Sequence, residues 1–179
     1  TYAQYISIDE NEVALKPKNL TMEEASSIPL VGLTAWQALV EKAQLQKGQK
    51  VFIQAGSGGV GTLAIQLAKH LGAMVATTAS AANADWLKRL GADVVIDYKT
   101  QDFETLLRDY DVVLNSQDAK TLHKSLNTLK AGGQLISISG PPDAQFASDA
   151  GLPWFMKGVM RLLSYKIRKE AKQRQINYA

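Results

Sequence analysis

The sequence predicts an α/β fold in which helices cover both faces of a doubly wound parallel sheet. Between residues 50 and 139, short apolar runs rich in strand-forming residues alternate with helical segments long enough to cross over a sheet. Such alternation requires right-handed connections between parallel strands that are buried on both faces. Glycines also follow the ends of predicted helices, where a left-handed residue needs no Cβ, at Gly72, Gly91 and Gly132-Gly133.

The segment before residue 50 predicts an extended start followed by two helices. Aromatic and β-branched side chains favour a strand in the first eight residues, at Tyr2, Tyr5, Ile6 and Ile8. Thr21 and Glu24 have the spacing of a capping box, which predicts a helix that ends before Pro29. A second helix is expected to run through Trp36 and to end near Gly48, with Thr34 as a candidate cap at its start.

The alternating region and the segment after it give the remaining expected elements. Strands are expected over residues 51–54, 73–78, 93–97, 111–115 and 134–139. Helices are expected over residues 59–71, 84–90, 101–108 and 118–129. After a turn at residues 141–143, we expect a loop over 144–151, one helix over 156–172 and the start of a strand over 175–179.

Four glycines lie between the first strand of the alternating region and its helix, and three of them match a dinucleotide-binding fingerprint. Gly56, Gly58 and Gly61 have the G-x-G-x-x-G spacing, in which glycine permits a tight turn, close approach of a pyrophosphate and close helix–strand packing. The unpaired N–H groups of the first helical turn attract an anion. We therefore expect a Rossmann-type, three-layer αβα fold. Its expected cofactor contacts at this turn are Gly56, Ser57, Gly58, Gly59, Val60 and Gly61.

The glycine turn by itself is compatible with more than one kind of protein. Some glycine-rich crossovers bind no ligand, and some related folds bind a different nucleotide-like cofactor. A methyltransferase that uses S-adenosylmethionine shares the strand–glycine–helix opening. Such an enzyme normally has an acidic residue after its second strand, and this chain has none there.

The residues after the second predicted strand favour NADP(H) over NAD(H). An acidic residue at this position binds the ribose 2′-hydroxyl of NAD and repels the extra phosphate of NADP. Here residues 78–81 read Thr-Ala-Ser-Ala, and the first acidic residue is Asp85 in the next helix. Recognition of the phosphate would rest on neutral donors, for which the candidates are Thr78, Ser80, Asn83 and Tyr98. Asn83 is equally a candidate N-cap of the following helix.

The composition argues against several kinds of site and partner. The chain has no cysteine and two histidines, too few for a thiolate zinc site or a metal cluster, so we expect no metal. Residues 157–174 carry seven basic side chains and one acidic side chain, without interleaved aromatic repeats. We interpret this segment as a solvated face and expect no nucleic-acid or membrane partner. No apolar run is long enough to span a bilayer, and a cytoplasmic protein is expected.

Short motifs that occur in one order along nearly the whole chain resemble a known superfamily. The motifs are residues 2–5 (YAQY), 29–36 (PLVGLTAW), 55–61 (AGSGGVG), 90–93 (LGAD), 97–98 (DY), 129–133 (LKAGG) and 138–140 (ISG). Together they resemble the medium-chain dehydrogenase/reductase superfamily. Within it, the chain is similar to the zinc-free branch related to quinone oxidoreductase and zeta-crystallin.

The resemblance implies a second set of cofactor contacts, at the nicotinamide end. By family position, the residues involved are Thr34, Asn115, Ser116, Ser139 and Gly140. Thr34 also fits a helix cap, and the Ser139–Gly140 pair also fits a turn. The resemblance assigns Tyr98 to the 2′-phosphate, whereas Asn83 stands where close relatives often have a lysine.

The resemblance also implies a domain organisation and an activity. Residues 1–20 match the end of a GroES-like catalytic domain, and residues 21–179 match an NADP-binding Rossmann domain truncated at its carboxyl end. The full-length protein would transfer a hydride from NADPH to a quinone or an α,β-unsaturated carbonyl, and the family often pairs two subunits. Catalytic residues stay unassigned, because they belong mostly to the missing domain, and this chain alone is expected to bind cofactor with little turnover. The alternative is a non-catalytic NADPH-binding sensor or structural module.

Overall fold

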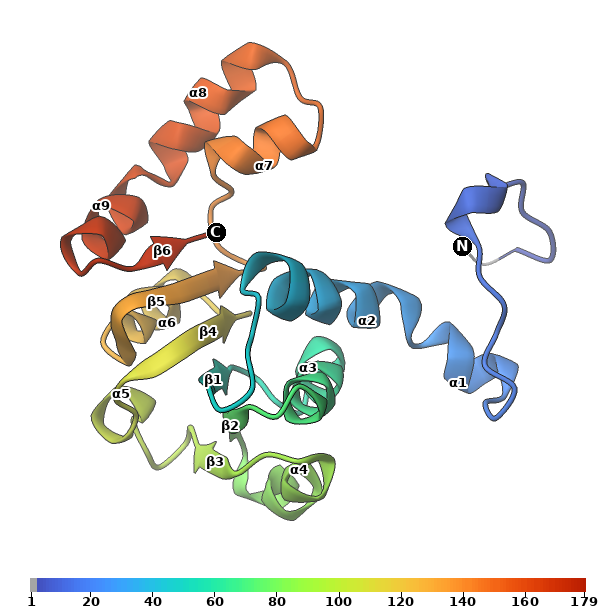
Figure 1. Cartoon of the computed structure of the whole chain (residues 1–179), viewed down its shortest axis with the longest axis horizontal. Helices are drawn as coiled ribbons and strands as arrows, with labels where there is room; N and C mark the ends of the chain where they lie inside the picture. Colours follow the sequence, from blue (N-terminus) through green and yellow to red (C-terminus); the bar gives the residue numbers. More distant parts are fainter. Residues whose placement is uncertain (1–2) are drawn as a thin grey trace.

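The computed structural model describes residues 3–179 as a parallel sheet with helices on both faces (Figure 1). In this range the sheet has six strands in the order β3-β2-β1-β4-β5-β6, and all neighbouring strands run parallel. The strands are β1 Lys50–Ile53, β2 Met74–Ala79, β3 Val94–Asp97, β4 Tyr110–Asn115, β5 Leu129–Ser137 and β6 Asn177–Tyr178. The order reverses between β1 and β4, which is where doubly wound sheets bind their ligands. The predicted fold class is confirmed.

Helices form a layer on each face of the sheet. One layer contains α2 Pro29–Trp36, α3 Gly59–His70 and α4 Ala84–Leu90, whose buried side chains join a single apolar cluster. The other layer contains α5 Phe103–Leu106, α6 Ala119–Ser125 and α9 Tyr165–Gln173, which join a second cluster. Three more helices lie away from the sheet, namely α1 Met22–Ser26, α7 Ala144–Asp149 and α8 Trp154–Leu163 (Figure 1).

Strand β1 shows why the central strands are continuous apolar runs. Val51 and Ile53 belong to the cluster on one face of the sheet, and Phe52 belongs to the cluster on the other. Alternate side chains of a strand point to opposite faces, and here both faces are covered by helices. All three side chains are therefore fully buried.

The amino-terminal region confirms one prediction and corrects another. The capping box is present, because Glu24 N donates to Thr21 Oγ1 at 3.1 Å and Thr21 N donates to Glu24 Oε2 at 2.9 Å. The expected strand is absent from residues 3–8, and Tyr2 lies outside the described residues. A strand needs a neighbouring backbone for its hydrogen bonds, and no described segment pairs with residues 3–8. The first regular element is a 3₁₀ turn over Glu10–Glu12.

The second helix starts earlier than expected, and this removes Thr34 as a candidate cap. Pro29 occupies the first turn of α2, where its missing N–H costs nothing. The helix continues directly into a π-helical segment, Gln37–Lys42. Thr34 therefore lies inside α2, and its hydroxyl donates to the Leu30 carbonyl at 2.7 Å.

The segment after β5 is more helical than expected. Residues 144–151 were expected to form a loop, but α7 occupies most of them, because Asp143 caps it by accepting from Phe146 N at 2.9 Å. The single helix expected over 156–172 is divided into α8 and α9 at Ser164. The Ser164 hydroxyl is buried and donates to the Met160 carbonyl at 2.8 Å. The expected strand after them is confirmed as β6, which pairs with β5.

Strand β5 begins earlier than expected and takes in the Gly132–Gly133 pair. Helix α6 ends at Ser125, so these glycines do not cap a helix, which corrects that prediction. Gly132 has a φ of +80°, and the pairing of β5 with β4 shifts register between Tyr110 and Val112. The glycines therefore serve an irregularity inside a strand. By contrast, Gly72 and Gly91 follow α3 and α4 with positive φ, as expected.

Candidate functional site

The glycine turn between β1 and α3 is packed so closely that side chains are excluded from it. A Cβ on Gly61 would lie 2.4 Å from the Ala55 carbonyl oxygen and 2.8 Å from the Gly56 Cα, and both are backbone atoms. A Cβ on Gly56 would lie 2.2 Å from the Thr77 hydroxyl of β2. Gly61 therefore allows the helix to approach the strand, and Gly56 allows the turn to approach β2, as the fingerprint predicts. This geometry brings the amino end of α3 to the carboxyl edge of the sheet.

Only some of the N–H groups in this turn are free to meet an anion. Ala55 N donates to Thr78 Oγ1 at 3.1 Å, Gly56 N donates to the Thr78 carbonyl at 3.0 Å, and Gly58 N donates to the Ala55 carbonyl at 2.9 Å. Within residues 3–179, no acceptor contacts the N–H groups of Ser57, Gly59, Val60 and Gly61. Ser57 and the first turn of α3 therefore present four N–H groups to an anion, with the helix dipole behind them.

A cavity of about 820 Å³ lies beside this turn, at the carboxyl ends of four strands. It brings together three of the predicted site residues, Ser57, Thr78 and Tyr98. Ser80 and Asn83 do not line it, and they contact each other, with Asn83 Nδ2 donating to Ser80 Oγ at 3.4 Å. Asn83 occupies the N-cap position of α4, but its side chain makes no capping hydrogen bond.

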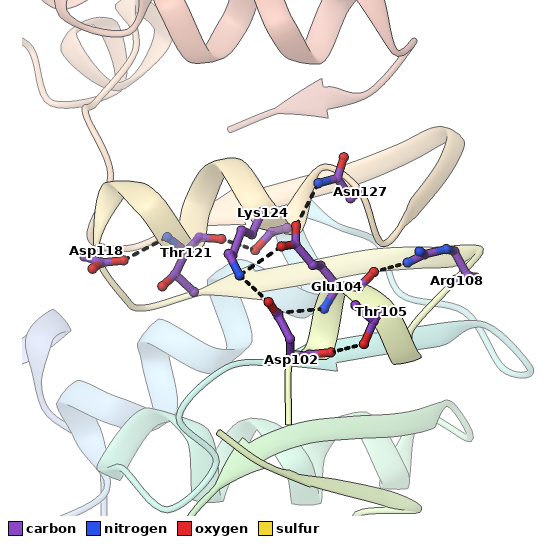
Figure 2. A network of polar contacts seen from close by, with 9 residues as sticks. Asp102, Glu104, Thr105, Arg108, Asp118, Thr121, Lys124 and Asn127 are labelled. Atoms are coloured by element: carbon purple, nitrogen blue, oxygen red, sulfur yellow. Dashed lines mark hydrogen bonds and ion pairs between the residues drawn. The ribbon is translucent and has the colours of Figure 1, made fainter. Parts of the chain in front are cut away.

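The sequence analysis did not predict which charged side chains line this cavity. Three lysines line it, Lys99, Lys120 and Lys124, although they are far apart along the chain. The positive charge of Lys124 is balanced by ion pairs with Asp102 and, at 2.9 Å, with Glu104 (Figure 2). These contacts raise the pKa of Lys124, and the hydrogen bond from Lys124 lowers the pKa of each carboxyl group. The only sequence signal for Lys99 is its position directly after Tyr98.

Asn115, the last residue of β4, lies in a buried polar network. It is 0% exposed, and its Nδ2 donates to Gln54 Oε1 at 2.6 Å. Its Oδ1 accepts from Ser137 Oγ at 2.8 Å and contacts Ser139 Oγ at 3.2 Å. Gln54 in turn donates from Nε2 to Ser125 Oγ of α6 at 2.6 Å. The side chain of Asn115 thus links β1, β4, β5 and α6, and its direct contact with a cofactor stays a prediction.

The turn after β5 is shaped by the same network. Gly140 N donates to Ser137 Oγ at 2.8 Å, and Ser139 Oγ donates to the Gln117 carbonyl at 2.6 Å. A Cβ on Gly140 would lie 2.6 Å from Ser137 Oγ and 2.8 Å from the Tyr178 hydroxyl. The turn-forming role of Ser139 and Gly140 is therefore supported, and their contact with a cofactor stays a prediction.

Ser116 follows β4 directly. Its hydroxyl contacts the carbonyl oxygen of Gln54 at 3.3 Å, which ties the end of β4 to the end of β1. The backbone after β4 thus meets the backbone after β1 at the point where the strand order reverses. A role of Ser116 in cofactor binding stays a prediction.

The structure of residues 3–179 also bears on metals and membranes. No group of three or more His, Cys, Asp or Glu side chains in this range could hold a metal ion. Nor does this range contain a helix with the length and apolar character needed to cross a bilayer. The basic side chains of α8 and α9, such as Lys157, Arg161 and Lys166, are exposed, as a solvated face requires.

Comparison with known proteins gives relatives that are named as a reductase and an oxidoreductase. The chain is 42% identical over 149 residues to the 2-methylene-furan-3-one reductase of Solanum lycopersicum. It is 37% identical over 149 residues to the chloroplastic NADPH-dependent alkenal/one oxidoreductase of Arabidopsis thaliana. Each match covers 80% of this chain and 38% of the relative, so the chain spans well under half the length of these relatives.

A solved structure and a family profile place the chain among the same kind of proteins as these relatives. The quinone oxidoreductase from Coxiella burnetii superposes with a TM-score of 0.70 at 33% identity, covering 93% of this chain and 46% of that one. The profile of the family described as zinc-binding dehydrogenase matches residues 59–164, which is more than half of the chain. The chain therefore belongs to the zinc-binding dehydrogenase family, in the medium-chain dehydrogenase/reductase superfamily that its motifs resemble.

Proposed function

We propose that this chain is the NADP(H)-binding part of an oxidoreductase that reduces quinones or α,β-unsaturated carbonyls. One observation carries the proposal: four free N–H groups at the start of α3 lie beside a cavity whose β2 end has no carboxylate. A pyrophosphate fits the free N–H groups, and the absence of an acidic residue leaves room for a 2′-phosphate. The close packing around Gly56 and Gly61 fits a cofactor that must approach the backbone.

The residues of the chain would bind and orient the cofactor. Ser57 and the first turn of α3 would hold the pyrophosphate, and Thr78 and Tyr98 would contact the adenosine ribose and its phosphate. Ser80 and Asn83 would add donors at the end of β2. When bound, NADPH supplies a hydride from C4 of its nicotinamide. Thr34, Asn115, Ser116, Ser139 and Gly140 would define the nicotinamide end.

The substrate class and the rest of the protein are also part of the proposal. The names of the tomato and Arabidopsis relatives point to conjugated carbonyl substrates, and the Coxiella structure points to quinones. A zinc-free site, a GroES-like domain preceding residue 21, a homodimer and a cytoplasmic location stay predictions. Relatives named as chloroplastic and mitochondrial favour no single compartment.

The cofactor assignment is tested by titrating the 179-residue chain with NADPH and NADH under identical conditions, following tryptophan quenching or heat. We expect NADPH to bind at least about tenfold more tightly than NADH, because residues 78–83 carry no carboxylate that would bind the ribose 2′-hydroxyl and repel the 2′-phosphate. Equal or tighter binding of NADH would contradict the NADP(H) assignment. Failure to bind either cofactor would contradict the dinucleotide site itself.

The full-length protein tests the catalytic part of the proposal against the sensor alternative. We expect NADPH oxidation that depends on an added quinone or enone, measured by the loss of absorbance of the reduced nicotinamide. Saturated analogues of the same carbonyl compounds are the matched control, because they lack the electrophilic alkene carbon. Tight NADPH binding without turnover across the panel would favour a non-catalytic binding module.

A further inference from the structure

The carboxyl end of β2 lacks both kinds of charge that normally distinguish the two dinucleotides. Doubly wound folds bind the 2′-hydroxyl of NAD with an acidic residue at this position, and accommodate the 2′-phosphate of NADP with a nearby arginine. Residues 78–83 contain neither an acidic nor a basic residue. Neutral donors alone bind a dianion less strongly than a cation does. A cation from another element would therefore be needed to balance the phosphate.

Lys99 is brought to this position by the turn after β3. Strand β3 pairs with β2, and beyond the last paired residues Tyr98 N donates to the Ala79 carbonyl at 3.3 Å. The next residue is held as well, because Lys99 N donates to Asp97 Oδ1 at 3.1 Å. Tyr98 and Lys99 both line the cavity, together with Thr78 and Ala79 of β2. The lysine thus lies on the same wall as the end of β2.

The other two lysines of the cavity are less suitable. Lys124 is already paired with two carboxylates. Lys120 comes from α6, on the far wall, beside Asp118, which caps that helix by accepting from Thr121 N at 2.8 Å. Hydrogen bonds from Thr121 lower the pKa of Asp118, and the charge of Lys120 adds to this effect. Lys99 makes no ion pair with any side chain of residues 3–179. Its ammonium group is the available positive charge on the β2 wall.

We propose that the ammonium group of Lys99 binds the adenosine 2′-phosphate and makes the site selective for NADP(H). Tyr98, which is 61% exposed, would add its hydroxyl as a neutral donor beside the lysine. This role rests on the proposed dinucleotide function and adds to it the residue that determines specificity. The charge that doubly wound folds usually carry at the end of β2 is here supplied by the neighbouring strand.

The experiment uses two small nucleotides that differ only in the phosphate concerned. Calorimetry with the 179-residue chain compares adenosine 2′,5′-bisphosphate with adenosine 5′-monophosphate. We expect Lys99→Met to weaken binding of the bisphosphate about tenfold and to leave binding of the monophosphate unchanged. Lys99→Arg is expected to retain the preference. Added salt should reduce the preference of the wild-type chain more than that of Lys99→Met, because the contact is solvent-exposed.

Two matched variants separate this role from general charge effects. Lys120→Met removes a lysine from the far wall of the cavity, and Lys47→Met removes an exposed lysine just before β1, at the opposite edge of the sheet. Both are expected to keep the preference for the bisphosphate. An equal loss with Lys120→Met, or a preference that survives Lys99→Met, would overturn the assignment to Lys99 while leaving the dinucleotide site standing. Binding of neither nucleotide by the wild-type chain would overturn both.

Discussion

Replacing Gly61 with alanine is expected to destabilise the chain by about 3 kcal/mol, a cost at the upper end for overpacking. The added methyl group would lie 2.4 Å from the Ala55 carbonyl oxygen, and no flexible side chain is present there to move aside. Helix α3 would have to shift away from β1, which would also displace the free N–H groups of its first turn. We therefore expect weaker NADPH binding together with the loss of stability. Urea unfolding measures the first effect, and cofactor titration measures the second.

The control for this variant is Gly158→Ala. Gly158 lies within α8, has no positive φ, and a Cβ there would meet no atom within 4 Å. Alanine forms helix better than glycine by about 1 kcal/mol, so this variant should be neutral or slightly stabilised. If Gly61→Ala unfolds at the same urea concentration as Gly158→Ala and binds NADPH normally, the glycine turn does not have the close packing described.

Replacing Asn115 with leucine is expected to cost about 3 kcal/mol of unfolding free energy, since more than one buried polar group would lose its partner. Gln54 Oε1 would lose the donor that lies 2.6 Å away, and Ser137 would lose its acceptor at 2.8 Å. Leucine has a similar size, so the loss arises from unpaired polar atoms. Chemical denaturation followed by circular dichroism measures it.

The variant Ser139→Ala provides the matched comparison for Asn115→Leu. Ser139 contacts the same amide oxygen, but it is exposed, so water can replace its hydrogen bonds. The free energy of unfolding of the Ser139→Ala variant should stay within about 0.5 kcal/mol of the wild-type value. A stability change for Asn115→Leu no larger than that of Ser139→Ala would show that the buried network contributes little to folding.

The alternating strands and helices of residues 50–139 could be predicted from the sequence, because each depends on a pattern of residues that are close together in the chain. Val51, Phe52 and Ile53 form a continuous apolar run, as a strand covered on both faces requires. The helix after the glycine turn has a 3.6-residue apolar period. The capping box at Thr21 and the N-terminal turn of α3 likewise depend on residues that are neighbours in the chain.

The misplaced elements depend on tertiary contacts that a single sequence does not display. Residues 3–8 have strand-forming side chains, yet a strand also needs a pairing backbone, and none is described beside them. Ser164 divides a continuous helical pattern, because its buried hydroxyl bonds the preceding turn. Lys99 and Lys120 meet at one cavity only through the order of the strands. The sequence likewise allowed Asn115 to be named as a candidate, but it could not predict that the side chain is buried, because that depends on tertiary contacts.

Thr78 joins the glycine turn and the cavity of the candidate site. Its hydroxyl and carbonyl oxygens accept from the first two N–H groups of the glycine turn, and the same residue lines the cavity that we propose holds the adenosine. If the proposed site is correct, cofactor preference at the end of β2 cannot be changed at Thr78 without also changing the glycine turn. A protein engineer who exchanges Thr78 to admit NADH would also loosen the turn on which either cofactor depends, whereas changes at Lys99 would leave that turn intact.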